Sequence, residues 1–173
     1  FATPFLQALR SPRPDAFIAT LGRPACREIL LHNPDVNECL TYDERGRHRS
    51  LKGKWEVVRL VRARRFDTAF VLRPSLSRTL LLWLAGIPVR VGFERAKSGW
   101  LLTRRIPASQ PPVHKASSYL PLLGAVGLSS LSSSYRYVVS PEERRSAAEH
   151  LKSLYLAAGV PLVVLHPGAN WPH

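Results

Sequence analysis

The stretch FDTAFVLRPSLSRTLLLWLAGIPVRVGF, residues 66–93, decides the fold of this chain. Residues 66–72 are rich in aromatic and β-branched side chains and predict a strand that is buried on both faces. Residues 75–85 predict an apolar helix, with a serine in the capping position and a glycine directly after the helix. Residues 87–93 predict a second buried strand. A strand, a helix and a strand in so short a stretch predict a right-handed βαβ unit in a parallel sheet.

Polar and basic side chains follow both strands of this unit, at the position where parallel sheets bind ligands. They are Arg73, Ser75, Ser77 and Arg78 after the first strand, and Glu94 and Arg95 after the second. Ser75 is first of all a helix cap, and its hydroxyl and the free backbone N–H groups beside it also suit a phosphate or sugar oxygen. The edge at which these strands end is therefore the candidate binding site.

Positive charge is concentrated in one segment of the chain. The formal net charge is +13, and residues 44–105 hold sixteen Lys or Arg against four Asp or Glu. Like charges without partners destabilise a compact chain, so this segment indicates an anionic partner such as phosphorylated sugars, anionic lipid head groups or nucleic acid. A solvated surface is the alternative interpretation of these arginines, and no single one of them stands out.

Alternating strands and helices continue on both sides of the βαβ unit and predict an α/β fold with a parallel sheet. Before it we expect a helix at 2–10, a strand at 15–21, a helix at 24–31, a strand at 36–42, a loop at 43–54 and a helix at 55–63. After it we expect a partly extended connection at 98–106, a helix from 114 or 116 to 126, an extended piece at 135–139, a helix at 140–158 that opens with a capping box, and a buried strand at 161–165 that starts a second sheet.

Several enzyme classes are excluded by the motifs that the chain lacks. The sequence has no G-x-G-x-x-G, P-loop, C-x-x-C, H-E-x-x-H or G-x-S-x-G motif. Its six histidines lack ligand spacing, so no metal site is expected. The longest apolar run, 80–89, is about half of a membrane span. Cys26 and Cys39 are interpreted as reduced, structural residues of a protein from a reducing compartment.

Four stretches together resemble the lipopolysaccharide heptosyltransferases, which are family 9 glycosyltransferases that take ADP-heptose as donor. They are ATPFLQALR at 2–10, HNPDVNECLTYD at 32–43, the stretch at 66–93 and LHPGANWPH at 165–173. The resemblance extends over nearly all 173 residues. Its most specific part is the order and spacing of AGIPVRVGF and HPGANWP.

The resemblance implies a GT-B architecture, in which two Rossmann-like domains with parallel sheets and helices on both faces are separated by a cleft. Residues 1–139 would then be an acceptor-binding N-terminal domain that lacks its first strand. Residues 140–173 would be the linker helix and the first strand and loop of a truncated C-terminal domain that binds the nucleotide sugar.

The resemblance also implies an inverting, metal-independent transfer of heptose from ADP-L-glycero-D-manno-heptose to the lipopolysaccharide inner core, without a cofactor. The general base of the family is an aspartate that we expect upstream of Phe1, so no catalytic residue is assigned in this chain. The donor loop of the family matches at Gly168, Ala169 and Asn170, and the lysine that follows it would lie after His173. We therefore expect this polypeptide to be inactive by itself.

The acceptor implied by the resemblance is lipid A that bears Kdo and heptose at the cytoplasmic face of the inner membrane. Its phosphate and carboxylate groups suit arginine. The candidate acceptor-binding residues are Ser75, Ser77, Arg78, Arg95, Arg59 and Arg62. Ser77 aligns with a basic residue of the family, whose place Arg78 would take. Cytoplasmic location and salt-sensitive, peripheral membrane association are expected.

Three other interpretations remain open. A basic nucleic-acid-binding α/β module is supported by the charge. However, the aromatic residues of the basic segment mostly occupy positions that we expect in the core, where they offer no stacking platform, so nucleic acid is not an expected partner. An α/β enzyme that uses another nucleotide-linked substrate is the second interpretation, and a relic that only binds its ligand is the third.

Overall fold

The structure is a computed structural model that describes residues 2–107, 117–129, 134–154, 163 and 165. The chain divides into two compact units, Phe1–Val138 and Val139–His173. In chain order the first unit contains α1 (Thr3–Arg10), β1 (Ala19–Gly22), α2 (Pro24–Leu30), β2 (Glu38–Thr41), α3 (Leu51–Ala63), β3 (Thr68–Val71), α4 (Leu76–Leu84), β4 (Val89–Phe93), the 3-10 helix η1 (Gly99–Leu101), β5 (Arg104–Ile106), the 3-10 helix η2 (Ser117–Tyr119) and α5 (Pro121–Gly124). The second contains α6 (Pro141–Ser153).

The strands of the first unit pair in parallel and form two sheets. β1 pairs with β2, and β3, β4 and β5 form a three-stranded sheet in that order. In the larger sheet Thr68 lies opposite Val89, and Val91 lies opposite Arg104. β3, α4 and β4 are the βαβ unit that the sequence predicted, so that prediction is confirmed.

Contacts at both ends of the strands show that the two sheets point in the same direction. Phe17, just before β1, stacks on Phe66, just before β3, with ring centroids 6.4 Å apart. At the other end the hydroxyl of Tyr42, after β2, lies 3.3 Å from the hydroxyl of Ser77, after β3. No backbone ladder joins β1 or β2 to β3 within the described part of the chain.

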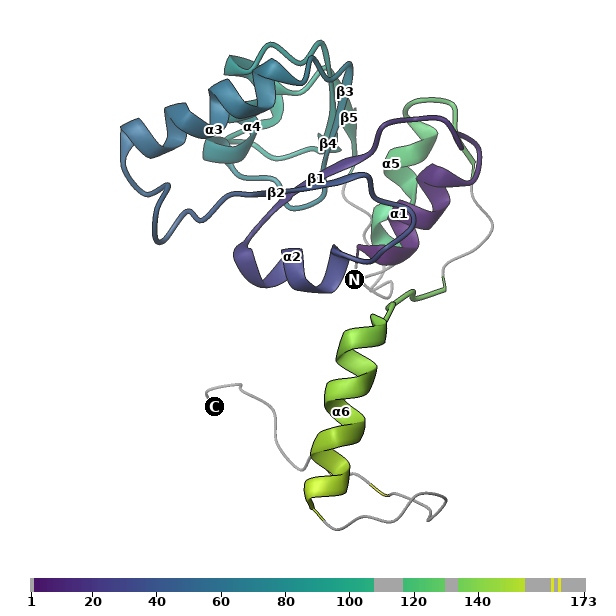
Figure 1. The fold of residues 1–173 in the computed structure, drawn as a ribbon. Helices are drawn as coiled ribbons and strands as arrows, with labels where there is room; N and C mark the ends of the chain where they lie inside the picture. The colour runs from purple at the N-terminus through teal and green to yellow at the C-terminus, as the bar shows by residue number, and fades with distance from the viewer. Residues whose placement is uncertain (1, 108–116, 130–133, 155–162, 164, 166–173) are drawn as a thin grey trace. The chain divides into compact units, whose positions relative to one another are not determined.

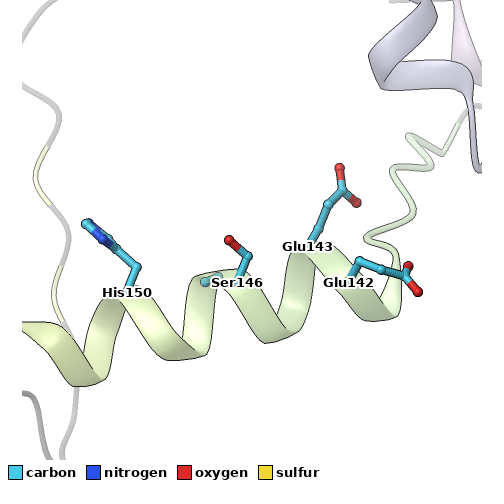
Figure 2. Close-up of a pocket in the computed structure, with 5 residues that line it drawn as sticks. Glu142, Glu143, Ser146 and His150 are labelled. Carbon is cyan, nitrogen blue, oxygen red and sulfur yellow. The ribbon is translucent and has the colours of Figure 1, made fainter.

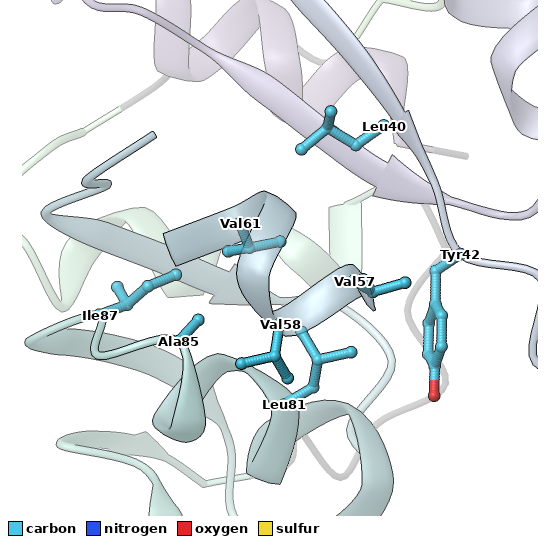
Figure 3. Close-up of a cluster of buried hydrophobic side chains, with 8 residues drawn as sticks. All are labelled: Leu40, Tyr42, Val57, Val58, Val61, Leu81, Ala85 and Ile87. Atoms are coloured by element: carbon cyan, nitrogen blue, oxygen red, sulfur yellow. The ribbon is translucent and has the colours of Figure 1, made fainter. Parts of the chain in front are cut away.

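Helices cover both faces of the strands, as expected for an α/β fold (Figure 1). On one face α3 and α4 pack on β2 and on the loop before β4, and Figure 3 shows the shared cluster of Leu40, Tyr42, Val57, Val58, Val61, Leu81, Ala85 and Ile87. On the other face α1 and α5 pack on β3 and β4, where Phe5 meets Phe70 edge to face at 5.2 Å. Burial of each such side chain stabilises the fold by roughly 1.5–3 kcal/mol.

The ends of α4 follow the sequence signals. The Ser75 hydroxyl accepts a hydrogen bond from the backbone N–H of Arg78 at 3.4 Å, which makes Ser75 the N-cap as predicted. Gly86, with φ of 81°, ends the helix in the left-handed region. The N–H of Gly86 donates to Trp83, and the next N–H donates to Leu82, which satisfies two carbonyls of the last turn.

We predict that Gly86→Ala lowers the free energy of unfolding by about 1 kcal/mol, because a Cβ is unfavourable at positive φ. Urea denaturation followed by circular dichroism measures this change. The matched control is Gly124→Ala, at the end of α5, where a Cβ meets open space and the backbone is not left-handed. That control leaves the stability unchanged or raises it. Equal losses in both variants would contradict the role given to Gly86.

Two element boundaries before the βαβ unit differ from the prediction. The helix expected to start at Trp55 starts at Leu51, because the hydroxyl of Ser50 accepts from the N–H of Gly53 at 3.1 Å and caps it. The strand expected from residue 15 starts at Ala19. Residues 13–16 instead turn around the guanidinium of Arg10, which donates to the carbonyls of residues 14 and 16 at 2.8 and 2.6 Å.

Two more differences lie after this unit. The connection expected at 98–106 contains η1 and the edge strand β5. The sequence did not predict β5, because a strand of three residues is too short to show a pattern. The helix expected up to residue 126 is divided within the described residues into η2 and the short α5. The Gly127 that follows has φ of 75° and stops the helix.

The described residues of the second unit form a well-capped helix with no buried residue. The hydroxyl of Ser140 accepts from the N–H of Glu143 at 3.1 Å, and the Glu143 carboxylate accepts from the N–H of Ser140 at 2.7 Å, so the predicted capping box is confirmed. Of the buried strand predicted at 161–165, the structure describes Val163 and Leu165, which are 78% and 84% exposed and lie outside any strand, so the prediction is wrong for these two residues. Every residue of α6 is likewise at least partly exposed.

Candidate functional site

Loops from β2, β3 and β4 meet at the edge where these parallel strands end. We call this edge the rim and define it as residues 42–48, 73–78 and 94–95. The hydrogen bond between the hydroxyls of Tyr42 and Ser77 joins its first two loops. Because β4 pairs in parallel with β3, its following residues lie at the same edge. The sequence prediction that this edge collects polar and basic side chains is therefore confirmed for Ser75, Ser77, Arg78 and Arg95.

Arg78 is held in place by an acidic partner. Its Nε donates to Oε1 of Glu44 at 2.5 Å, and its Nη2 forms a salt bridge with the same oxygen. Nη1 also donates to the carbonyl of Arg73 at 3.3 Å. Glu44 therefore offsets the charge of Arg78 and fixes its guanidinium beside the start of α4. A ligand anion that binds Arg78 has to compete with this carboxylate.

His48 closes the loop that follows β2. Its side chain is buried, and its Nδ1 accepts from the backbone N–H of Asp43 at 2.9 Å. The backbone N–H of His48 donates in return to the Asp43 carbonyl at 2.9 Å. Since Nδ1 accepts, the ring proton of the neutral imidazole lies on Nε2.

Sequence reasoning missed four residues of the rim, which are Tyr42, Asp43, Glu44 and His48. The signal was present, since three of them directly follow a predicted strand or end it. The sequence could not show that Tyr42 and Glu44 reach the start of α4, thirty-five and thirty-four residues away.

Arg95 supplies positive charge at the end of β4. Its backbone carbonyl accepts from the N–H groups of Ser98 and Gly99 at 3.2 and 2.8 Å, which fixes the turn after the strand. The side chain is exposed, and within the described residues it forms no salt bridge. Arg95 is therefore available to an anion without first losing a partner.

Arg59 and Arg62 lie away from the rim. Both are exposed on the outer face of α3, which runs against the direction of the strands and ends where β3 is about to begin. Arg64, at that end of α3, pairs with Glu38 at the start of β2. Arg59 and Arg62 are therefore separate from the four other acceptor candidates, and their assignment to the acceptor stays a prediction. Gly168, Ala169 and Asn170 lie outside the described residues.

The pair between Arg64 and Glu38 is bidentate. Nε donates to Oε2 at 2.7 Å and Nη2 donates to Oε1 at 2.5 Å. The hydrogen bond from Arg64, opposed by partial desolvation and helped by the opposite charge, lowers the pKa of Glu38, and the same pair raises the pKa of Arg64. The pair joins the end of α3 to the start of β2 and so fixes this end of the helix against the sheet.

We predict that Glu38→Gln lowers the free energy of unfolding at neutral pH by about 1 kcal/mol or less, as is usual for pairs that water reaches. Because the pKa of folded Glu38 lies below its ordinary value of 4.5, this stability is present above that value. It is lost as the pH falls through the lowered pKa. Urea titrations of both proteins across this acidic range measure the effect. A difference between the two proteins that is independent of pH would contradict it.

A shallow depression of about 570 Å³ lies along α6 and is shown in Figure 2. It is lined by Glu142, Glu143, Ser146, Ala147 and His150. Glu143 belongs to the capping box, and Glu142 lies 3.7 Å from Arg145 in a salt bridge. These side chains all come from one exposed helix, so we interpret them as a solvated face.

Among the described residues, no three side chains of the types His, Cys, Asp and Glu gather as the ligands of a metal ion would. No helix in this described part is both long enough and apolar enough to cross a membrane.

Known proteins similar to the chain are glycosyltransferases. Lipopolysaccharide heptosyltransferase 2 of Escherichia coli K12 is 28% identical over 88 residues, which are 51% of this chain and 25% of that protein. The crystal structure of a family 9 glycosyltransferase from Veillonella parvula matches with a TM-score of 0.82 and 25% identity, over 99% of this chain and 52% of that one. ADP-heptose LPS heptosyltransferase II of E. coli matches with a TM-score of 0.67 and 24% identity, over 92% and 48%.

No protein-family model matches the chain. The chain spans about half the length of the two solved relatives. The likeness in sequence and structure confirms the resemblance to the family 9 glycosyltransferases and the predicted α/β fold. Within that family the chain is similar to heptosyltransferase II.

Proposed function

We propose that the protein containing this chain is a glycosyltransferase that moves heptose from ADP-heptose to the lipopolysaccharide inner core. The observation that carries the proposal is the rim, where an exposed Arg95, without a salt bridge among the described residues, and the capped start of α4 lie at the ends of parallel strands. The same fold is found in a solved enzyme described as an ADP-heptose LPS heptosyltransferase. The acceptor would be lipid A with Kdo and heptose, and the reaction would be inverting and independent of metal.

In this proposal the rim binds and orients the acceptor. Arg95 and Arg78 contact its phosphate or carboxylate groups, and Ser77 holds a sugar hydroxyl near the cleft. An acceptor hydroxyl loses its proton to a carboxylate base supplied from outside these 173 residues. Its oxygen then bonds to the anomeric carbon as the bond from that carbon to ADP breaks.

The proposed organisation assigns acceptor binding to residues 1–139 and the first part of the donor domain to residues 140–173. Gly168, Ala169 and Asn170 would contact ADP-heptose, because a glycine lets the backbone approach a ligand closely. The protein would be cytoplasmic and would associate peripherally with the inner membrane that displays the acceptor.

A nucleic-acid-binding module is the second candidate, and one observation favours it. The aromatic residues of the basic segment were mostly expected in the core, but Trp55, Trp83 and Trp100 are 50%, 49% and 65% exposed. Exposed aromatic rings can stack on bases. The candidate remains second because the solved structures with the same fold that are described above are glycosyltransferases.

We predict that Arg95→Ala lowers kcat/KM for heptose transfer by roughly 10- to 100-fold in the protein that contains this chain and its flanking segments. The reason is the loss of a charge-assisted hydrogen bond to the acceptor. Transfer from ADP-heptose to purified inner-core acceptor measures the effect. The matched control is Arg13→Ala, which is exposed before the start of β1, at the opposite end of the parallel strands from the rim, and keeps full activity. Equal activity of Arg95→Ala and the unmodified enzyme would reject the assigned acceptor site.

We also predict that the 173-residue chain alone releases no ADP from ADP-heptose in the presence of acceptor, since it carries no assigned base. A coupled assay for free ADP measures this, with the longer protein as positive control. Turnover by the short chain would place the base within these residues and contradict the assignment.

A further inference from the structure

The outer face of α3 combines apolar and basic side chains in one stripe. Leu51, Trp55, Arg59 and Arg62 are spaced by four, four and three residues, which places them on one side of the helix. Leu51 is 84% exposed and Trp55 is 50% exposed. We call these four residues the α3 stripe.

The α3 stripe is hollowed around its indole. Trp55, Arg59, Arg62 and Ala63 line a shallow depression of about 430 Å³. The neighbouring acid, Glu56, lies 3.7 Å from Arg47 in a salt bridge, so its charge is already offset. The stripe therefore presents an apolar centre with positive charge beside it.

Packing of the first unit does not explain these exposed side chains. The opposite face of α3 supplies Val57, Val58 and Val61 to the core, and neither Leu51 nor Trp55 is part of that cluster. Leaving large apolar groups in water is unfavourable, and a patch of this kind marks an interaction surface. The partner must match the positive charge as well as the apolar groups.

We propose that the α3 stripe docks on an anionic lipid bilayer. Leu51 and Trp55 enter the boundary between head groups and acyl chains, where indole rings are favoured. Arg59 and Arg62 bind lipid phosphates beside them. This assigns the two arginines to the membrane surface and not to the sugar acceptor. The proposal rests on the proposed function in one respect, which is that the acceptor is displayed at a membrane.

A lipid surface fits the stripe better than nucleic acid does. The aliphatic side chain of Leu51 can neither stack on a base nor bind a phosphate. Next to an indole it suits the boundary between head groups and acyl chains. The stripe also lies on a surface helix, as interfacial anchors do.

Docking through α3 would bring the rim near the membrane. The first turn of α3 packs against the rim loop, since a Cβ added at Gly53 would lie 2.6 Å from the carbonyl oxygen of Arg47. Leu51 belongs to that same turn. Insertion of Leu51 thus places the acceptor candidates close to the head groups, where a lipid-linked sugar is displayed.

Vesicle co-sedimentation of the 173-residue chain tests the proposal, with phosphatidylcholine vesicles that contain or lack phosphatidylglycerol. We expect binding only to the anionic vesicles and release at high salt. Leu51→Gln with Trp55→Gln lowers the affinity at least about tenfold at low salt, because the apolar insertion is lost. Arg59→Gln with Arg62→Gln lowers it roughly thirtyfold, from two lost lipid contacts.

Matched controls distinguish binding through the α3 stripe from non-specific binding through any exposed indole or arginine. Trp100→Gln removes a more exposed indole on η1, a short helix that packs on α4 and β4. Arg23→Gln with Arg27→Gln removes two exposed charges at α2. Both controls keep full vesicle binding and, like the stripe variants, an unchanged circular dichroism spectrum. Equal binding by stripe variants and controls would overturn the proposal. So would tight binding of a single-stranded oligonucleotide by a chain that leaves the vesicles free.

These vesicles contain no inner-core acceptor, so the outcome is independent of heptose transfer. If the 173-residue chain leaves the vesicles free while the longer protein that contains it transfers heptose to soluble acceptor, the membrane site alone is rejected. If the chain binds vesicles while that longer protein has no transferase activity, the proposed function is rejected and the membrane site is kept.

Discussion

Parallel pairing of β3 with β4 is the constraint on which the first unit depends. Two parallel neighbours cannot be joined by a hairpin, so the chain crosses over through α4 and starts that helix at the end of β3. The capping hydroxyl of Ser75, the hydroxyl of Ser77 and the guanidinium of Arg78 reach one edge of the sheet for this reason. The chemistry at the rim follows from topology before any individual contact is considered.

Two glutamates pair with arginines in a chain that has a large excess of positive charge. Glu38 and Glu44 each hold one arginine by its guanidinium, one at the start and the other at the end of β2. These two pairs fasten α3 and α4 to the strands, while Arg95 and the α3 stripe keep their charge for partners. Arginines of one sequence segment thus divide into structural and interacting groups according to the acids within reach.

Local signals were sufficient for the elements with clear caps and periodicity. Ser75, Gly86 and the Ser140 capping box were interpreted correctly because each acts within a few residues of its own position. β5 was missed, since its three residues become a strand only by pairing with β4. The residues at the rim could be predicted because the ends of parallel strands locate them. The sequence did not separate Arg59 from the rim arginines, because a charge count over 44–105 does not say where along α3 a side chain lies relative to the strand ends.

The facing edges of β1 and β3 run in the same direction without a shared ladder in the described chain. A row of backbone donors and acceptors at each edge is a template for any extended segment of matching direction. An extended segment of the same polypeptide that paired with both edges would join the two sheets into one continuous sheet. In concentrated solution, a strand of another copy can pair with such an edge instead and join the two copies through their backbones.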